Sequence, residues 1–454
     1  MEMQSAHAAA RVPGLDPRIE AWLSRALDGR ITGVSRPASG GSRMTWFLDV
    51  RRDDGGAGDC VLRMEGQGSF TGTEVSLARE AAAYRVLEAA GVPAPRVLAQ
   101  APDGSAYLMT RLAGESDLSK LPAAERDAAM VDFIDCLAAL HSFDPRTIDA
   151  GVFALPATAE DHARLDLAMW QRLADAYLPD LDPLAQYAAG WLWRHAPARV
   201  ARTVFVQGDT GPGNFVARDG RVVGMVDLEF AHVGDPMDDL AWLRYRCKAL
   251  SIPLDEPALF SRYTQRSGIA IDRAAIDYYA LACDYRCVIT TSLAVARRGG
   301  ARGWPGYVLQ TQRYLQEIAG HLGRLCGVKE PAPELPAPVP GVRSDWYDEI
   351  VDCMRATVKA DVDADLRDRI RNALILANYL RAHDAGGDRI EALDREDCRA
   401  TLGAQCLEPG ALARHAAQAG RAADGATLRY LLRRAARMRH PWRVLLDRLD
   451  ARRR

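Results

Sequence analysis

The sequence has no long hydrophobic run. No apolar stretch approaches the roughly 18 residues that a helix needs to cross a bilayer, so we expect no membrane span. Residues 1–14 also lack the basic segment followed by an apolar core that marks a secretory signal peptide, and none is expected. These two absences favour a cytoplasmic protein.

Paired cysteines and an excess of one charge are missing as well. The nine cysteines are odd in number and never stand at the CxxC spacing, so neither a disulfide framework nor a zinc site is predicted. A formal net charge of −2 gives no reason to expect nucleic acid or a membrane surface as a partner.

The chain is long, and its hydrophobic pattern changes from β-prone to helical along the sequence. With 454 residues, two or three compact units are expected. Short β-prone runs punctuated by glycine come first, and long helical patterns begin near residue 122, interrupted by a β-rich island at residues 204–226. Strands first and helices later predict an α+β protein with two lobes.

A proline-rich stretch, EPAPELPAPVPG, occupies residues 330–341. Alternating prolines favour extended polyproline geometry, so we interpret it as a semi-rigid linker. The tail that follows, residues 342–454, shows only helical periodicity and is predicted to be all-helical.

The β-rich island contains a series of polar residues at strand ends. The segment VFVQGDTGPGNF places Asp209 after an apolar strand and Asn214 five residues later, and VVGMVDLEF places Asp227 at the end of the next strand. Phosphoryl transfer needs a carboxylate near the attacking hydroxyl and oxygen ligands for Mg²⁺ on the nucleotide phosphates. The three residues supply these groups in the order found in kinases.

Each part of this pattern also has a simpler explanation. An Asp followed by an Asn five residues later occurs about once by chance in a chain of this length, and Asp and Gly are common in turns. The combination is more specific, because GDP at residues 234–236 and DDLAW at residues 238–242 follow directly.

This block resembles the catalytic core of the aminoglycoside-phosphotransferase and choline-kinase-like family, whose pattern is HGD-x4-N, then IDWE or similar, then GDP and DLA. By this resemblance Asp209 is the catalytic base, and Asn214 and Asp227 are magnesium ligands. Asp239 would be a structural acid that anchors the following helix. Gln207 replaces the family's histidine; because glutamine also donates and accepts hydrogen bonds, activity is expected to survive.

The resemblance extends to the N-terminal part of the chain. Gly40, Gly41 and Ser42 are similar to the family's phosphate-covering loop, although a Gly-Gly pair is also common in hairpin turns. Arg63, where kinases usually have lysine, would lie over the α- and β-phosphates and pair with Glu80. A surface ion pair is the simpler alternative for these two residues.

Two further matches concern the hinge and a histidine. The segment YLMTRLAGE resembles the family's run into the hinge, which implies that Met109 to Arg111 face the adenine through backbone groups. His141, in LAALHSFDP, also matches. It is predicted to pack a helix or anchor a loop rather than to act in catalysis, because no nucleophile accompanies it.

Taken together, the resemblance implies a two-lobed, protein-kinase-like fold that uses ATP and Mg²⁺ to phosphorylate a small-molecule hydroxyl. It covers roughly residues 34–327. The implied domains are a nucleotide-binding N-lobe at 15–112, a catalytic and substrate-binding C-lobe at 113–329, the linker at 330–341 and a helical accessory domain at 342–454. No nucleic acid or membrane partner is expected, and a homodimer is left open.

The identity of the phosphate acceptor is inferred from the helices that follow Asp227, the predicted magnesium ligand. Residues 241–313 contain eleven Lys and Arg but only five Asp and Glu. This excess of positive charge disfavours a polycationic aminoglycoside as the acceptor and favours an anionic or neutral alcohol. A solvated arginine-rich surface is the alternative.

The segment YYALACDYRCVITTSLAVARRG is similar to the family branch fused to acyl-CoA dehydrogenases, which implies a substrate role for Arg286. The helical tail resembles the small partner of bacterial hydroxyacyl-CoA kinases. The leading acceptor is therefore a hydroxyacyl-CoA, whose phosphates arginines would attract.

Two rival functions remain. One is a kinase for a small neutral alcohol, such as a sugar, an amino alcohol or an antibiotic. The other is a pseudokinase scaffold, suggested by Gln207 and Arg63 in place of the usual residues. The joint presence of Asp209, Asn214, Asp227 and Glu80 argues against the scaffold, because an inactive site has no chemical need for all four.

Overall fold

A computed structural model of the chain describes the following residues: 12, 15–27, 29–36, 43–52, 54, 56, 58–65, 70, 72–148, 151–297, 303–331, 333–341, 343–359 and 362–451. The chain forms two compact units. The first comprises Met1–Leu155, Ala201–Asp239 and Ile252–Ile271; the second comprises Pro156–Val200, Leu240–Ser251 and Asp272–Arg454.

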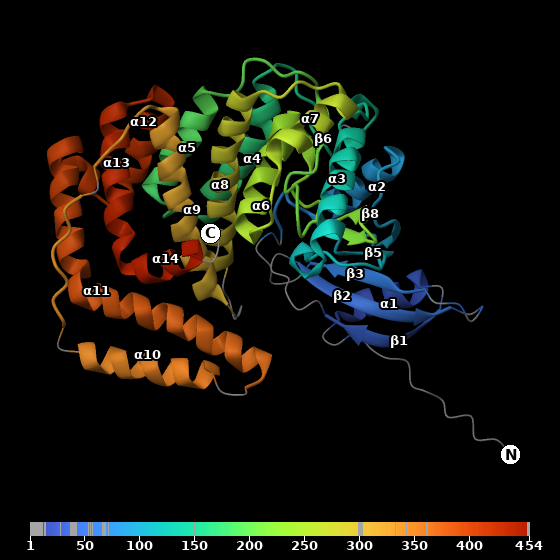
Figure 1. Ribbon diagram of the computed structural model, residues 1–454, viewed down its shortest axis with the longest axis horizontal. Coiled ribbons are helices and arrows are strands. Elements are labelled where there is room, and N and C mark those ends of the chain that lie inside the picture. The colour runs from blue at the N-terminus through green and yellow to red at the C-terminus, as the bar shows by residue number, and fades with distance from the viewer. Residues whose placement is uncertain are drawn as a thin grey trace. The chain divides into compact units, whose positions relative to one another are not determined.

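The first unit begins with a five-stranded antiparallel sheet (Figure 1). Its strands are β1 (Arg30–Ser35), β2 (Met44–Arg51), β3 (Cys60–Met64), β4 (Val97–Gln100) and β5 (Ala106–Thr110), in the order β1-β2-β3-β5-β4. Helix α1 (Pro17–Ala26) begins at the N-cap Asp16 and inserts Trp22 and Leu23 into a hydrophobic cluster with Leu48 and Leu62 of the sheet. Burial of these apolar side chains holds α1 on the sheet.

Helix α2 (Leu77–Ala89) lies in the same unit and follows the helical pattern seen in the sequence. Its N-cap is Ser76, whose hydroxyl accepts the Arg79 N–H. The helix ends before Gly91, which has a φ of +67°. The chain then turns into β4, and Glu80 stays fully buried on the inner face of the helix.

The remaining elements of the first unit include two small ribbons. They are η1 (Leu118–Lys120), α3 (Ala123–Leu140), η2 (Pro145–Thr147), β6 (Val204–Val206), β7 (Phe215–Arg218), β8 (Arg221–Met225), β9 (His232–Gly234) and α7 (Glu256–Ser267). Strand β6 pairs with β9, and β7 pairs with β8. Phe133 of α3 stacks on Phe215 of β7, with ring centroids 4.3 Å apart, which fixes the β7–β8 hairpin on α3. Helix α6 (Pro236–Leu250) follows β9.

The second unit is helical (Figure 1). Its further elements are α4 (Asp161–Tyr177), α5 (Pro183–Arg194), α8 (Arg273–Ala296), α9 (Trp304–Leu325), α10 (Ser344–Lys359), α11 (Ala364–Leu402), η3 (Ala404–Leu407), α12 (Ala411–Ala422), α13 (Gly425–Met438), η4 (His440–Trp442) and α14 (Arg443–Ala451). The helices that precede and follow the proline-rich stretch therefore belong to one unit.

Two glycines allow α12 to pack directly on α5. A Cβ placed on Gly420 would lie 2.2 Å from the Tyr187 carbonyl oxygen, and one on Gly190 would lie 2.6 Å from the Ala417 carbonyl oxygen. The Tyr187 hydroxyl also donates to the Asp424 carbonyl at 3.1 Å. The two backbones are thus in van der Waals contact, with no side chain at the crossing.

Ion pairs join α11 to α13. Arg437 contacts both Asp394, at 3.1 Å, and Asp397, and Arg433 contacts Asp397 at 2.8 Å. Arg434 pairs with Asp394 as well. The charged side chains of this cluster are largely removed from water, and each aspartate pairs with more than one arginine. The cluster is therefore a network and not a set of isolated surface pairs.

The fold predicted from the sequence is confirmed: an α+β chain with a β-rich N-lobe, mostly helical remainder and helical tail. The predicted domain boundaries stay predictions, and the two compact units do not follow them, because the chain before the linker contributes to both. No helix in the described part of the chain is long and apolar enough to cross a membrane.

Candidate active site

The loop after β6 needs glycine at one position. Gly208 has a φ of +86°, and a Cβ there would lie 2.3 Å from the Phe230 carbonyl oxygen. Any side chain would therefore clash with the backbone after β8. This close approach sets the position of the next residue, Asp209.

The Asp239 carboxylate anchors this loop. It accepts the Gln207 N–H at 2.8 Å, the Gly208 N–H at 2.9 Å and the Thr210 hydroxyl. The sequence predicts that Asp239 anchors the following helix; in the structure its carboxylate also holds the preceding loop. A fully buried carboxylate with several donors fixes the backbone before Asp209 in one conformation.

His141 completes this anchor. Its Nε2 lies 3.0 Å from Asp239 Oδ2 and its Nδ1 lies 2.7 Å from the Tyr263 hydroxyl, and the side chain is fully buried. This is the loop-anchoring position predicted for His141, which contacts the loop through Asp239.

Gln207 takes a scaffolding position. Its side-chain amide donates to the Asn214 carbonyl at 3.2 Å and to the Val226 carbonyl at 3.1 Å. It therefore connects the two ends of the β7–β8 hairpin. The side-chain amide of glutamine has two N–H donors, one for each of these carbonyls, so glutamine can hold the hairpin ends in place of the family's histidine.

Asp209 and Asn214 are in direct contact. The Asn214 amide nitrogen donates to Asp209 Oδ2 at 2.6 Å and to the Asp209 carbonyl at 2.7 Å. These bonds fix the orientation of the Asn214 side chain, with its amide oxygen as the remaining ligand atom. Asp209 itself is half-buried.

Asp227 has a strained backbone. Its φ of +61° lies in the left-handed region, which is uncommon for a residue other than glycine. Its N–H donates to the Tyr84 hydroxyl at 3.1 Å, and its carboxylate, 38% exposed, lies 3.3 Å from Arg63 Nη2. Such strain persists where the surroundings hold it, often at functional sites.

The predicted Arg63–Glu80 pair is formed. Arg63 Nη2 lies 2.7 Å from Glu80 Oε1, and the Glu80 side chain is fully buried. Burial raises the pKa of Glu80, and Arg63 opposes this shift. Burial alone would lower the pKa of Arg63, but Glu80, Tyr107 and Asp227 raise it well above its usual range. The simpler explanation, an exposed surface pair, does not apply.

Replacing Arg63 by Met is expected to destabilise the first unit by about 3–5 kcal/mol, because Glu80 would be left buried without its cation. Nucleotide binding should also weaken at least about tenfold if Arg63 lies over the phosphates. Thermal unfolding and ATP titration measure the two effects. Arg63→Lys is the control, since it keeps the charge. Unchanged stability and ATP affinity in Arg63→Met would contradict the assignment.

Other predicted contacts are placed differently or lie outside the described part. Gly40, Gly41 and Ser42 are outside the described residues. The Arg111 N–H donates to the Asp59 carbonyl at 3.3 Å, and Met109 is paired within the sheet. The adenine contact inferred for this stretch stays a prediction, and in this structure the Arg111 N–H is already used.

Arg286 is not exposed to solvent. Its Nε and Nη2 lie 2.8 and 2.7 Å from Asp166 Oδ2, and its side chain is 5% exposed. Several other arginines behind the anionic-acceptor argument also have acidic partners: Arg244 pairs with Asp277, and Arg262 and Arg266 pair with Asp135. The charge excess in the sequence therefore gives less support to an anionic acceptor than its count implies.

Two charged residues of the site were missed by the sequence analysis. Glu229, two positions after Asp227, is 8% exposed, and burial together with Asp227 and Glu80 raises its pKa to about 8. Arg43 is buried and bonds Glu65 at 3.0 Å. The letters VDLEF contained Glu229, but only the fold shows that it lies among other carboxylates.

The carboxylates, the Asn214 amide and the paired Arg63 cation all belong to the first compact unit. The sequence model of the Phosphotransferase enzyme family matches residues 34–277, which is more than half of the chain. The chain belongs to this family, and the class predicted from the sequence, a phosphotransferase, is confirmed.

Individual relatives are more distant. Acyl-CoA dehydrogenase family member 11 of Rattus norvegicus is 26% identical over 242 residues, which are 50% of this chain and 30% of that protein. The N-acetylmuramate/N-acetylglucosamine kinase of Caulobacter vibrioides is 29% identical over 209 residues, 43% of this chain and 57% of that protein. The match thus spans less than two thirds of either relative. The solved choline kinase LicA from Streptococcus pneumoniae gives a TM-score of 0.48 at 15% identity, covering 66% of this chain and 98% of that one.

Proposed function

We propose that the chain transfers the γ-phosphoryl group of ATP to a hydroxyl of a small molecule. The observation that carries this proposal is the position of Asp209, on a loop fixed by Asp239 and in contact with Asn214. A rigidly held, half-buried carboxylate is what an attacking hydroxyl needs as its proton acceptor.

The proposed step follows from these residues. Asp209 orients the acceptor hydroxyl and takes its proton as the oxygen attacks the γ-phosphorus. The bond between this phosphorus and the β,γ-bridging oxygen breaks at the same time, and ADP leaves with the bond's electron pair. Arg63, held by Glu80, binds the phosphates of the nucleotide. The Gln207 bonds keep Asn214 and the strand end before Asp227 at a fixed spacing, so no reorganisation of the loop is required during transfer.

The donor set of the site fits Mg²⁺. Asn214 and Asp227 offer an amide oxygen and a carboxylate, which are hard oxygen ligands. Among the described residues there is no group of three or more His, Cys, Asp and Glu that could hold a metal ion by itself. When bound, Mg²⁺ would neutralise charge on the phosphates.

The acceptor that we propose first is a hydroxyacyl-CoA. Support comes from the relative whose name places it in the acyl-CoA dehydrogenase family. The buried pairing of Arg286 with Asp166 makes it a framework residue rather than a free phosphate ligand, so the proposal does not depend on Arg286. The relative named as an N-acetylmuramate/N-acetylglucosamine kinase favours a second candidate, a sugar hydroxyl.

A panel of alcohols with Mg-ATP tests both candidates. It contains 3-, 4- and 5-hydroxyacyl-CoAs, the matching free hydroxy acids, N-acetylglucosamine, choline and an aminoglycoside. Phosphate added to the product is detected by mass. Turnover of the thioesters but not of the free acids is expected. Turnover of the sugar alone would replace the CoA proposal, and tight Mg-ATP binding without any turnover would favour a scaffold.

A further inference from the structure

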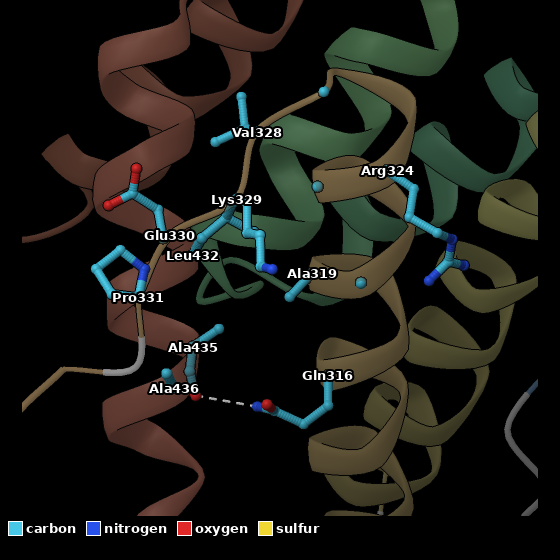
Figure 2. Close-up of a pocket in the computed structure, with 13 residues that line it drawn as sticks. Gln316, Ala319, Arg324, Val328, Lys329, Glu330, Pro331, Leu432, Ala435 and Ala436 are labelled. Atoms are coloured by element: carbon cyan, nitrogen blue, oxygen red, sulfur yellow. Dashed lines mark hydrogen bonds between the residues drawn. The ribbon is translucent and has the colours of Figure 1, made fainter.

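A pocket lies in the helical unit and is lined only by residues of that unit. It is open to solvent, has a volume of about 620 Å³, and has α9, the chain after it and α13 as its walls (Figure 2). This volume is within the range of about 300–1,000 Å³ that ligand pockets occupy in proteins. None of its lining residues belongs to the candidate active site.

The cavity exists because small residues face each other. Ala319, Gly320 and Gly323 line it from α9, and Ala435 and Ala436 line it from α13. A glycine inside a helix costs about 1 kcal/mol relative to alanine. Packing accounts for Gly323, because a Cβ there would lie 3.0 Å from the Val328 carbonyl oxygen. A Cβ on Gly320 would meet only the tip of the Arg324 side chain, at 3.4 Å, which shows that packing does not require a glycine there.

The charges around the cavity are unbalanced. Glu330 is neutralised by Arg433 at 3.1 Å. Arg324 and Lys329 also line the cavity, both are exposed, and within the described residues neither has an acidic partner. Figure 2 shows the Lys329 side chain extending from the linker side towards Ala319 of α9. Figure 2 also shows the Arg324 side chain extending away from α13, so Lys329 is the cation that faces this pocket.

The rest of the lining is apolar or already hydrogen-bonded. Val328, Pro331 and Leu432 supply apolar surface, and the Gln316 amide donates to the Ala435 carbonyl at 3.0 Å, drawn as a dashed line in Figure 2. An apolar wall with one or two cations at its edge is complementary to an organic anion with an aliphatic body.

We propose that this cavity binds a small organic anion, with Lys329 facing its charged group and the Ala and Leu side chains facing its aliphatic body. The site is independent of the proposed phosphoryl transfer. Because both α9 and α13 line it, a bound anion would connect the helix before the linker to the tail and stabilise their association.

Thermal-shift and calorimetric titration of the full chain test this proposal with three probes. Octanoate is expected to bind saturably and raise the unfolding temperature. Octylamine, with the opposite charge, and inorganic phosphate, without the aliphatic body, are expected not to bind. No saturable octanoate binding would overturn the proposal, as would equal binding of octylamine.

Two variants and a matched control localise the site. Lys329→Gln should weaken octanoate binding about fivefold, in keeping with an exposed ion pair. Lys359→Gln, at an exposed lysine of α10, should leave binding unchanged. Gly320→Leu should reduce binding by filling the space without lowering the unfolding temperature. Unchanged octanoate affinity in both Lys329→Gln and Gly320→Leu would overturn this location.

Discussion

Replacing Asp209 by Asn is expected to lower kcat by about 10²–10⁴-fold while leaving ATP affinity within a factor of a few. An amide cannot take the proton of the acceptor hydroxyl, and general-base catalysis contributes effects of this size. The change removes no group assigned to the nucleotide, so binding should persist. Single-turnover transfer measures the first effect, and calorimetric titration with Mg-ATP the second.

The neighbouring network provides the control for this prediction. Asn214 donates to Asp209 Oδ2 at 2.6 Å, and an asparagine at 209 can turn its amide oxygen to accept the same bond. The loop should therefore keep its conformation, and the unfolding temperature should change little. Near-normal turnover in Asp209→Asn would show that another group accepts the proton. A large loss of stability would mean that the activity result reports on folding.

Replacing Gly420 by Ala is expected to destabilise the helical unit by about 2–3 kcal/mol. The added methyl group would lie 2.2 Å from the Tyr187 carbonyl oxygen, and a backbone atom cannot rotate away as a side chain can. Helix propensity predicts the opposite sign, a gain of up to about 1 kcal/mol, so the direction of the effect distinguishes the two causes. Thermal unfolding measures stability, and limited proteolysis of residues 330–341 measures how often the tail detaches.

Gly386→Ala in α11 is the matched control for this effect. A Cβ there would meet only the Arg389 side chain, at 3.5 Å, so the variant should gain about 0.5–1 kcal/mol. If Gly420→Ala also gained stability and left proteolysis unchanged, the close packing of α12 on α5 would not exist in solution.

Much of the candidate site could be predicted from local sequence order. Asp209, Asn214 and Asp227 stand at strand ends within 19 residues of one another, in the order of the family pattern, and phosphoryl transfer needs the chemical groups that they carry. The Arg63–Glu80 pair was also predicted, because the resemblance to the family places a strand cation and a helix acid at these positions. Their catalytic roles stay predictions, whereas their placement is a finding.

The remaining features depend on contacts between distant residues. Nothing in the sequence near Arg286 shows that Asp166, 120 positions away, neutralises it, so counting charges overestimated the cationic surface. Gly420 looks like an ordinary helix glycine until α5 is placed against it. In both cases the residue that makes the contact is far away in sequence, and neither hydrophobic periodicity nor composition can predict which distant residues meet.

The contact between α5 and α12 has a thermodynamic consequence, because the linker joins its two sides covalently. A short tether gives the tail an effective concentration on the order of millimolar at its docking surface. An intrinsic affinity of only about 1 mM, or about 4 kcal/mol, would already leave the tail bound half of the time, and each further 1.4 kcal/mol raises the ratio of bound to free tail about tenfold. The fused arrangement therefore tolerates a docking surface that would be too weak to hold two separate polypeptides together at cellular concentrations.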